Sequence, residues 1–263
     1  MTVDPTVRPP LDLHITVHDG GPHNFVLVHG SMDREGGFAR LVKFLRPHGR
    51  VTTYDRRGYG RSLTATGARD LAAHIDDLGA IIGDRPSIVI GHSLGGSIAL
   101  GLATRVPHLV TGLVVYESPM SWEPWWSRDT GGAAAARAAT PEDAAEAFLR
   151  RFVGDERWER LPQRTKDARR AEGGALRDET VSLRSGCPWG DRRLACPIVS
   201  GAGDRSRDDF RRSAEVVSSL SDDGRRVTLL NAHHNAHSAD PQQFYEKLVR
   251  PILDRIETGT WSG

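Results

Sequence analysis

Short apolar runs alternate with amphipathic segments along most of this chain, and this alternation limits the possible folds more than any other feature. The strand-like runs lie at residues 24–30, 50–54, 86–91, 109–118, 196–204 and 225–232. Segments with apolar residues at helical spacing separate them, for example residues 38–49 and 71–84. Strands that alternate with helices usually lie parallel in one sheet, and the helices cover both of its faces. The sequence therefore predicts an α/β fold with a mostly parallel, doubly covered sheet.

The alternation is modified at two places. Residues 11–20 alternate as a half-buried strand does, and the Gly-rich turn at 18–24 predicts an early hairpin with the run that follows. Between residues 119 and 190 the segments have the pattern of short helices with no strand between them. We therefore expect residues 119–190 to form a helical lid, inserted into one core made of residues 1–118 and 191–263.

The composition favours a small molecule as the partner. Lys and Arg number 35 against 34 Asp and Glu, and the resulting formal net charge of +1 gives no global attraction to nucleic acid or to an anionic membrane. No segment has the apolar length of a signal-peptide core or a membrane span, which predicts a soluble, cytoplasmic protein. Cys187 and Cys196 are expected to be free thiols. No pattern in the chain indicates an oligomeric state.

One serine stands between a predicted strand and a predicted helix, flanked by glycines. Gly91, Ser93 and Gly95 fit the pattern G-x-S-x-G, whose serine lies on a sharp strand-to-helix turn with its hydroxyl exposed. Small neighbours are needed there because the backbone passes close to flanking elements. The helix that starts after the serine directs unpaired N–H groups toward negative charge near the hydroxyl. Ser93 is therefore a candidate nucleophile, and the Leu94 N–H is a candidate oxyanion donor.

Five motifs in a fixed order resemble those of the α/β-hydrolase family, and the resemblance covers almost the whole chain. They are "LVHGS" at 27–31, "YDRRGYGRS" at 54–62, "GHSLGG" at 91–96, "GAGD" at 201–204 and "HHNAH" at 233–237. By this resemblance they correspond to an oxyanion loop, a supporting Gly-rich loop that contains Asp55 and Arg56, the nucleophile elbow, the acid loop and the histidine loop. The resemblance implies an α/β-hydrolase fold with a short helical lid.

A serine nucleophile needs a base, and histidine is the usual one. The family's histidine loop, followed by a proline-led final helix, aligns here on Ala232 and Pro241 and implies His234 as the base. His233 stands where the family usually has glycine, and His237 falls where it often has a second, structural histidine. We rank His234 first, His233 second and His237 third.

The histidine in turn needs an acid that fixes its tautomer. By resemblance this acid is Asp204, which lies in the loop after a predicted apolar strand and preserves the family's order of serine, acid and histidine. Glu117 is the alternative, because some relatives have the acid one strand earlier. The predicted triad is Ser93, Asp204 and His234.

Two further predictions concern the surroundings of the serine. The resemblance implies that the second oxyanion donor is the N–H of Ser31 or of Met32, because Gly30 permits close backbone approach there. Trp122, Trp125 and Trp126 lie where the predicted lid begins, and they either line an apolar substrate pocket or hold the lid against the core. We carry all three as candidate pocket residues.

The predicted function is that of a serine hydrolase which cleaves a small ester, thioester or lactone through an acyl-enzyme. No metal or organic cofactor is expected, because the histidines of "HHNAH" belong to the histidine loop. A cofactor-free, haloperoxidase-like perhydrolase and a carbon–carbon bond hydrolase are alternatives on the same triad. A non-catalytic small-ligand receptor on the same fold is an alternative of another class.

Overall fold

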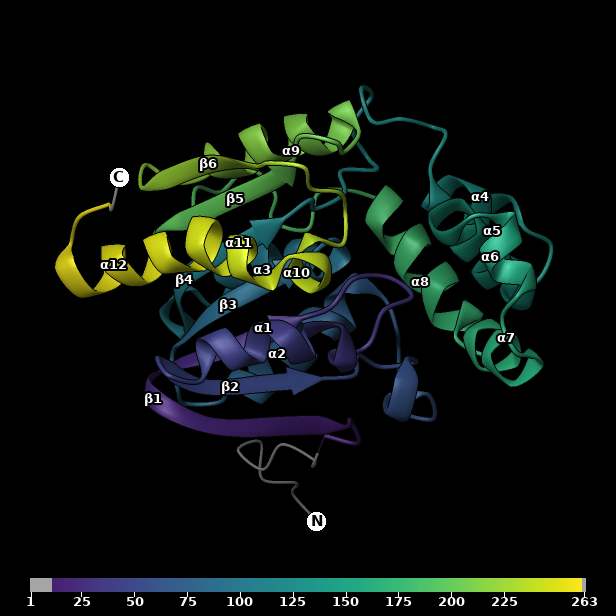
Figure 1. The fold of residues 1–263 in the computed structure, drawn as a ribbon, viewed down its shortest axis with the longest axis horizontal. Helices are drawn as coiled ribbons and strands as arrows, with labels where there is room; N and C mark the ends of the chain where they lie inside the picture. Colours follow the sequence, from purple (N-terminus) through teal and green to yellow (C-terminus); the bar gives the residue numbers. More distant parts are fainter. Residues whose placement is uncertain (1–10, 262–263) are drawn as a thin grey trace, which may run out of the picture.

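A computed structural model describes residues 11–261. Its centre is a six-stranded sheet with the strand order β2-β1-β3-β4-β5-β6 (Figure 1). The strands are β1 (Ile15–Val28), β2 (Gly49–Tyr54), β3 (Ser87–His92), β4 (Val110–Tyr116), β5 (Ile198–Gly203) and β6 (Gly224–Leu229). All neighbours pair parallel except the first residues of β1, which run antiparallel to β2. The predicted α/β class and the mostly parallel sheet are confirmed.

The N-terminal strand contains the turn of the expected hairpin. The structure has one long strand, β1, where two strands and a turn were predicted. Its first residues pair antiparallel with β2, from Ile15 opposite Tyr54 to His18 opposite Val51. The register then shifts at Pro22, and Asn24 to Leu27 lie beside Arg50 to Thr53. The β2 partner numbers fall along the first arm of β1 and rise along the second, so the Gly-rich turn predicted here does reverse the chain, and both arms of β1 pair with β2.

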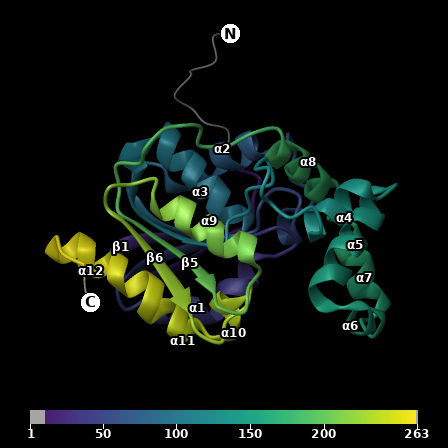
Figure 2. The ribbon, with the colours of Figure 1, turned by 90° about the horizontal axis from the view of Figure 1, so that it is seen from above.

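Helices cover both faces of the sheet (Figures 1 and 2). One face packs against α2 (Leu71–Ile82), α3 (Leu94–Arg105) and α9 (Asp208–Ser218). The other packs against α1 (Ala39–Leu45), α11 (Pro241–Phe244) and α12 (Arg250–Thr258). The short elements are the 3-10 turns η1 (Glu35–Phe38), η2 (Gly60–Ser62) and η3 (Pro107–Leu109), the helix α10 (Ala236–Ala239) and the π-helical segment η4 (Tyr245–Val249).

Five helices form an insertion between β4 and β5, at one end of the sheet (Figure 1). They are α4 (Gly131–Arg137), α5 (Pro141–Val153), α6 (Asp155–Glu159), α7 (Gln163–Arg170) and α8 (Gly173–Arg184). Thr130 and Thr140 begin α4 and α5 by accepting backbone N–H bonds from Ala133 and Asp143, as N-caps do. Within residues 11–261, no helix combines the length and apolarity needed to cross a membrane.

Candidate active site

Ser93 lies on the sharp turn between β3 and α3, at the carboxyl edge of the sheet. Its backbone has φ 53° and ψ −125°, a conformation that residues other than glycine rarely adopt. Its N–H donates to the Tyr116 carbonyl at 2.8 Å. A Cβ on Gly95 would lie 2.0 Å from the Val28 carbonyl oxygen, and one on Gly91 would lie 2.6 Å from the Gly95 carbonyl oxygen. Glycine at both positions is thus what allows the turn to fit.

The loop after β1 lies directly against this serine. A Cβ on Gly30 would be 2.8 Å from the Cβ of Ser93, so the backbone of the loop reaches Ser93 only because residue 30 is glycine. Ser31 lines the same cavity as Ser93 and Leu94. Met32 follows with a positive φ of 55° and lines a second cavity together with Ser93. The predicted oxyanion residues therefore gather around Ser93.

His234 faces a buried carboxylate at the same edge of the sheet. Its Nδ1 lies 2.7 Å from Oε2 of Glu117, the residue that follows β4. The other carboxylate oxygen accepts the Gly203 N–H at 2.8 Å. Burial alone would raise the pKa of Glu117, but the bond and charge of His234 and the Gly203 amide outweigh it and hold this pKa below its ordinary value. Glu117 is therefore an anion held against the ring.

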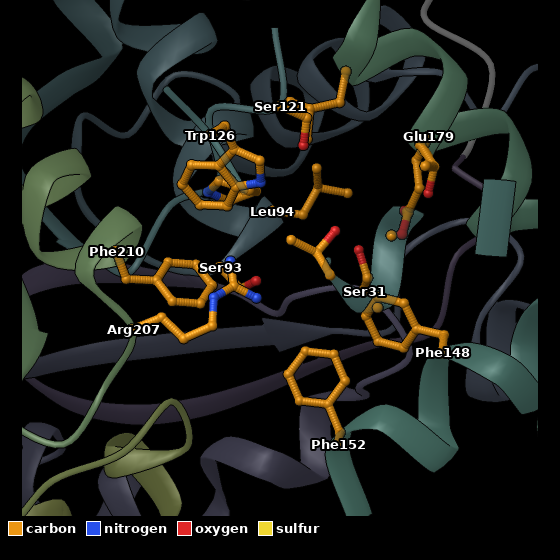
Figure 3. A pocket seen from close by; sticks show the side chains of 16 residues that line it. Ser31, Ser93, Leu94, Ser121, Trp126, Phe148, Phe152, Glu179, Arg207 and Phe210 are labelled. Atoms are coloured by element: carbon orange, nitrogen blue, oxygen red, sulfur yellow. The ribbon is translucent and has the colours of Figure 1, made fainter. Parts of the chain in front are cut away.

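Two cavities meet at Ser93. The first, here called the Trp126 cavity, has a volume of about 60 Å³ (Figure 3). The second, the Asp33 cavity, has a volume of about 220 Å³ and contains both Ser93 and His234 in its wall. Both cavities are lined by Ser31, Ser93, Phe148 and Phe152. The Trp126 cavity alone is lined by Leu94, Trp126, Leu183, Arg207 and Phe210. The Asp33 cavity alone is lined by Met32, Asp33, Arg169, His234 and His237.

Two phenylalanines flank the His234 ring. Phe210 of α9 stacks on it with ring centroids 4.7 Å apart, and Phe152 of α5 lies at 5.5 Å. Phe152 also packs on Phe148, one turn earlier, at 4.7 Å. The insertion therefore reaches the histidine through α5. Sequence inspection missed these aromatic residues, because nothing in the spacing of Phe148 and Phe152 distinguishes them from core positions of an amphipathic helix.

Comparison with known proteins agrees with this architecture. Residues 25–247 match the family model described as the alpha/beta hydrolase family. The chain belongs to this family. Among solved structures, an N-acyl homoserine lactonase, AidH, has a TM-score of 0.73 at 18% identity and covers 96% of this chain and 97% of its own. A thermophilic esterase from Thermogutta terrifontis has a TM-score of 0.72 at 19% identity over 94% and 95% of the two chains. At such identities the likeness concerns the fold.

Curated relatives match only in part. Lipase LipV of Mycobacterium tuberculosis is 30% identical over 150 residues, which are 55% of this chain and 56% of that protein. The bifunctional esterase/perhydrolase DCH of Acinetobacter calcoaceticus is 30% identical over 97 residues, 34% and 35% of the two chains. This α/β hydrolase thus spans about half or less of the length of these relatives.

The predicted acid, Asp204, does not contact His234 in this α/β hydrolase. It lies exposed after β5, and its Oδ1 accepts the Ala232 N–H at 3.1 Å. Backbone hydrogen bonds from Asn231 and Ala232 lower the pKa of Asp204, and the bond from Asn231 has the larger effect. The pairing of Asp204 with His234 was therefore wrong, and the alternative residue, Glu117, makes that contact. Asp204 instead joins the ends of the acid and histidine loops.

The three candidate histidines occupy different surroundings. His234 is the one whose ring meets Glu117. His233 is exposed, and its carbonyl accepts the Tyr116 hydroxyl at 3.0 Å. His237 is buried, with Nε2 at 3.7 Å from Oδ2 of Asp33. The geometry therefore favours His234, as the family alignment predicted.

One group of side chains has the composition of a metal site. In the described part of the chain, Asp33, His92 and His237 are the one such group, with ligand atoms within 4.8 Å of one another. His92 uses its Nε2 to bind the His234 carbonyl at 2.9 Å. Burial alone would raise the pKa of Asp33, but the nearby imidazoles of His237, His29 and His92 outweigh burial and hold this pKa well below its ordinary value, so the carboxylate is ionised. The bond from His92 joins this group to the histidine loop.

The three candidate tryptophans separate into one cavity residue and two packing residues. Trp126 lines the Trp126 cavity and packs edge-on against Phe210 at 5.2 Å. Trp122 packs on Trp189 at 5.1 Å, and Trp125 lies under the Arg212 guanidinium at 4.4 Å. Neither of these two lines the Trp126 cavity or the Asp33 cavity. The structure gives these two rings packing contacts, which is the second of the two alternatives predicted for them.

Proposed function

We propose that this α/β hydrolase is a serine hydrolase whose catalytic residues are Ser93, His234 and Glu117. The observation that carries the proposal is the 2.7 Å contact between His234 Nδ1 and the buried Glu117. The His234 side chain and Ser93 line the same cavity. Because Nδ1 is occupied, Nε2 is the nitrogen left for proton transfer. The N–H groups of Ser31 and Leu94 are the proposed oxyanion donors, and the helical insertion is the proposed lid.

The steps follow from this assignment. The Ser93 oxygen attacks the substrate carbonyl carbon while His234 Nε2 takes the hydroxyl proton. The carbonyl oxygen becomes an oxyanion, which the Ser31 and Leu94 N–H groups stabilise. Glu117, being ionised, stabilises the imidazolium. The tetrahedral intermediate then collapses, and the leaving group takes the proton from His234. In the second half of the reaction water attacks the acyl carbon while His234 takes a proton from it. His234 then returns this proton to the Ser93 oxygen as the acid leaves.

The two cavities suggest how a substrate lies. His234 delivers a proton to the leaving group, so the leaving group belongs on the side of the Asp33 cavity, which has His234 in its wall. The acyl group then enters the Trp126 cavity, which at about 60 Å³ is the smaller of the two against about 220 Å³ for the Asp33 cavity. The proposed substrate is therefore an ester, thioester or lactone with a short acyl part and a larger, more polar leaving group.

Labelling with a fluorophosphonate tests the nucleophile. We expect a single label on Ser93, found by intact and peptide mass spectrometry, together with multiple turnover of p-nitrophenyl acetate and butyrate and weaker turnover of the octanoate. The Ser93→Ala variant should keep the fold and lose both label and turnover. A folded wild-type protein that neither labels nor turns over any of these esters would contradict the proposal and favour a ligand-binding role.

A further inference from the structure

A fully buried arginine binds the backbone of the loop that carries Gly30 and Ser31. Arg56, in the Gly-rich loop after β2, donates from Nε to the His29 carbonyl at 2.9 Å and from one terminal nitrogen to the Gly30 carbonyl at 3.0 Å. Its own backbone N–H donates to His29 Nε2 at 2.9 Å. His29 is therefore the Nδ1–H tautomer, and this Nδ1 donates to the Gly30 carbonyl at 2.8 Å.

The charge of this arginine is balanced from the insertion. The remaining terminal nitrogen of Arg56 donates to Oε2 of Glu179, in α8, at 2.8 Å. The other oxygen of Glu179 accepts the Tyr59 hydroxyl at 2.7 Å. The Arg56 and Glu179 side chains are both 0% exposed, and Glu179 also lines the Trp126 cavity (Figure 3). One buried ion pair thus joins the insertion to the loop beside the nucleophile.

Peptide geometry connects this ion pair to the oxyanion site. A trans peptide unit is planar, with its carbonyl and its N–H pointing in opposite directions, and the described residues contain no cis peptide bond. The Gly30 carbonyl and the Ser31 N–H belong to one such unit. Two donors, from Arg56 and His29, hold this carbonyl, and they therefore fix the opposite direction for the Ser31 N–H.

We propose that Arg56 and Glu179 are positioning residues, through which helix α8 sets the direction of the Ser31 N–H toward the oxyanion. This inference rests on the proposed function of Ser93 and Ser31. It also selects Ser31 over Met32 as the second donor, because the peptide unit held by Arg56 is the one that contains the Ser31 nitrogen. Without the carboxylate of Glu179, the guanidinium of Arg56 loses its buried counter-charge and rotates away from the two carbonyls.

The test compares Glu179→Gln with Asp77→Asn. Asp77 of α2 pairs with Arg57, the next residue of the same loop, at 2.7 Å, and this pair touches neither His29 nor Gly30. Both substitutions replace a carboxylate by its amide in an arginine pair. We expect Glu179→Gln to lower kcat about 10- to 100-fold with KM changed less than threefold, because oxyanion alignment acts on the transition state. Asp77→Asn should stay within about twofold of wild type.

A binding measurement separates positioning from general damage. A short alkylboronic acid forms a tetrahedral adduct with the serine, and its affinity for Glu179→Gln should fall by the same factor as kcat. If Glu179→Gln destabilises the fold too far, Glu179→Asp keeps the charge with a shorter reach and should show a smaller loss in both quantities. Equal kcat and equal boronate affinity in the Glu179 variants and Asp77→Asn would overturn the proposal.

The wild-type control keeps the two proposals apart. Absence of Ser93 labelling and of turnover in the wild type counts against the proposed function itself. A crystal structure of Glu179→Gln tests the orientation of the Gly30–Ser31 peptide directly, whether or not the wild type is active. Rotation of the Gly30–Ser31 peptide is the expected result, and an unmoved peptide with Arg56 still bound to both carbonyls would contradict the positioning role.

Discussion

Glu117 Oε2 lies 2.7 Å from Nδ1 of His234, although 116 residues separate the two in sequence. Glu117 follows β4 with a φ of 52°, and its N–H donates to the Gly201 carbonyl of the neighbouring strand β5 at 3.0 Å. The residue thus continues the sheet contact while its side chain turns toward the histidine loop. A strained backbone at such a site is consistent with a functional constraint.

Replacing Glu117 should therefore be far more damaging than replacing Asp204. Glu117→Gln preserves the shape but removes the anion, and the amide no longer fixes the Nδ1–H tautomer. We expect kcat on p-nitrophenyl acetate to fall about 10³- to 10⁴-fold. Asp204→Asn should stay within about threefold of wild type, because the Asp204 side chain accepts the Ala232 N–H and the amide oxygen of asparagine can accept it as well. The reverse pattern of kcat values would assign the acid to Asp204.

The sequence sufficed for the sheet and for the turn that carries Ser93, but not for the carboxylate that meets His234. Alternating runs and the glycines around Ser93 determine local geometry, and local geometry is what a sequence pattern encodes. Glu117 and Asp204 each follow one of two adjacent parallel strands, β4 and β5, and end at the same edge of the sheet. Which carboxylate reaches His234 depends on side-chain length and loop path, and neither has a sequence signature.

The insertion was predictable as a group of helices but not in its contacts. Its capping threonines and apolar spacing are local features. The pairing of Glu179 with Arg56 joins positions 123 residues apart and depends on how α8 lies on the core. Trp125 and Trp126 are sequence neighbours with the same chemistry, yet only the second faces the Trp126 cavity. The sequence pattern does not tell which of the two rings points inward.

Stability should fall as the pH drops below about 6.5, the ordinary pKa of histidine. Burial, with the charge of Arg56, lowers the pKa of His29 to about 3, and burial holds the pKa values of His74 and His92 well below the ordinary value. In the unfolded chain these rings protonate below pH 6.5, so the unfolded state binds more protons and gains in stability relative to the folded state. Glu117, whose folded pKa is lowered, adds a further loss below about pH 4.5.

His74, buried in α2, allows a single-residue test of this pH dependence. Urea unfolding at pH 8 and pH 5.5 gives the loss of unfolding free energy between the two values. In His74→Leu this loss should be smaller than in wild type by about 1.4 kcal/mol, the linkage for one group with an unfolded pKa near 6.5. His108 is exposed, and His108→Leu should leave the loss unchanged. Identical losses in all three proteins would contradict the expected linkage.

Trp126 should control the acyl length that the enzyme accepts. Trp126→Ala removes a ring from the wall of the Trp126 cavity, and we expect the ratio of kcat/KM for p-nitrophenyl octanoate over acetate to rise about tenfold. Trp125→Ala is the matched control, since Trp125 is half-buried under Arg212 outside that cavity. Its ratio should not change. Equal ratios in both variants would show that the acyl group lies elsewhere.

The backbone conformation of Ser93, which exposes the hydroxyl, should lower the free energy of unfolding. A residue with a Cβ at φ 53° and ψ −125° carries strain of about 1–3 kcal/mol, which glycine avoids. Ser93→Gly should therefore unfold in urea with a free energy about 1 kcal/mol higher than Ser93→Ala, even after the greater unfolded-state entropy of glycine. Ser97, four residues later in the regular part of α3, is the matched position. There the order should reverse, with Ser97→Gly about 1 kcal/mol less stable than Ser97→Ala, because glycine lowers helix stability. The same order at both positions would mean that the turn at Ser93 stores no strain.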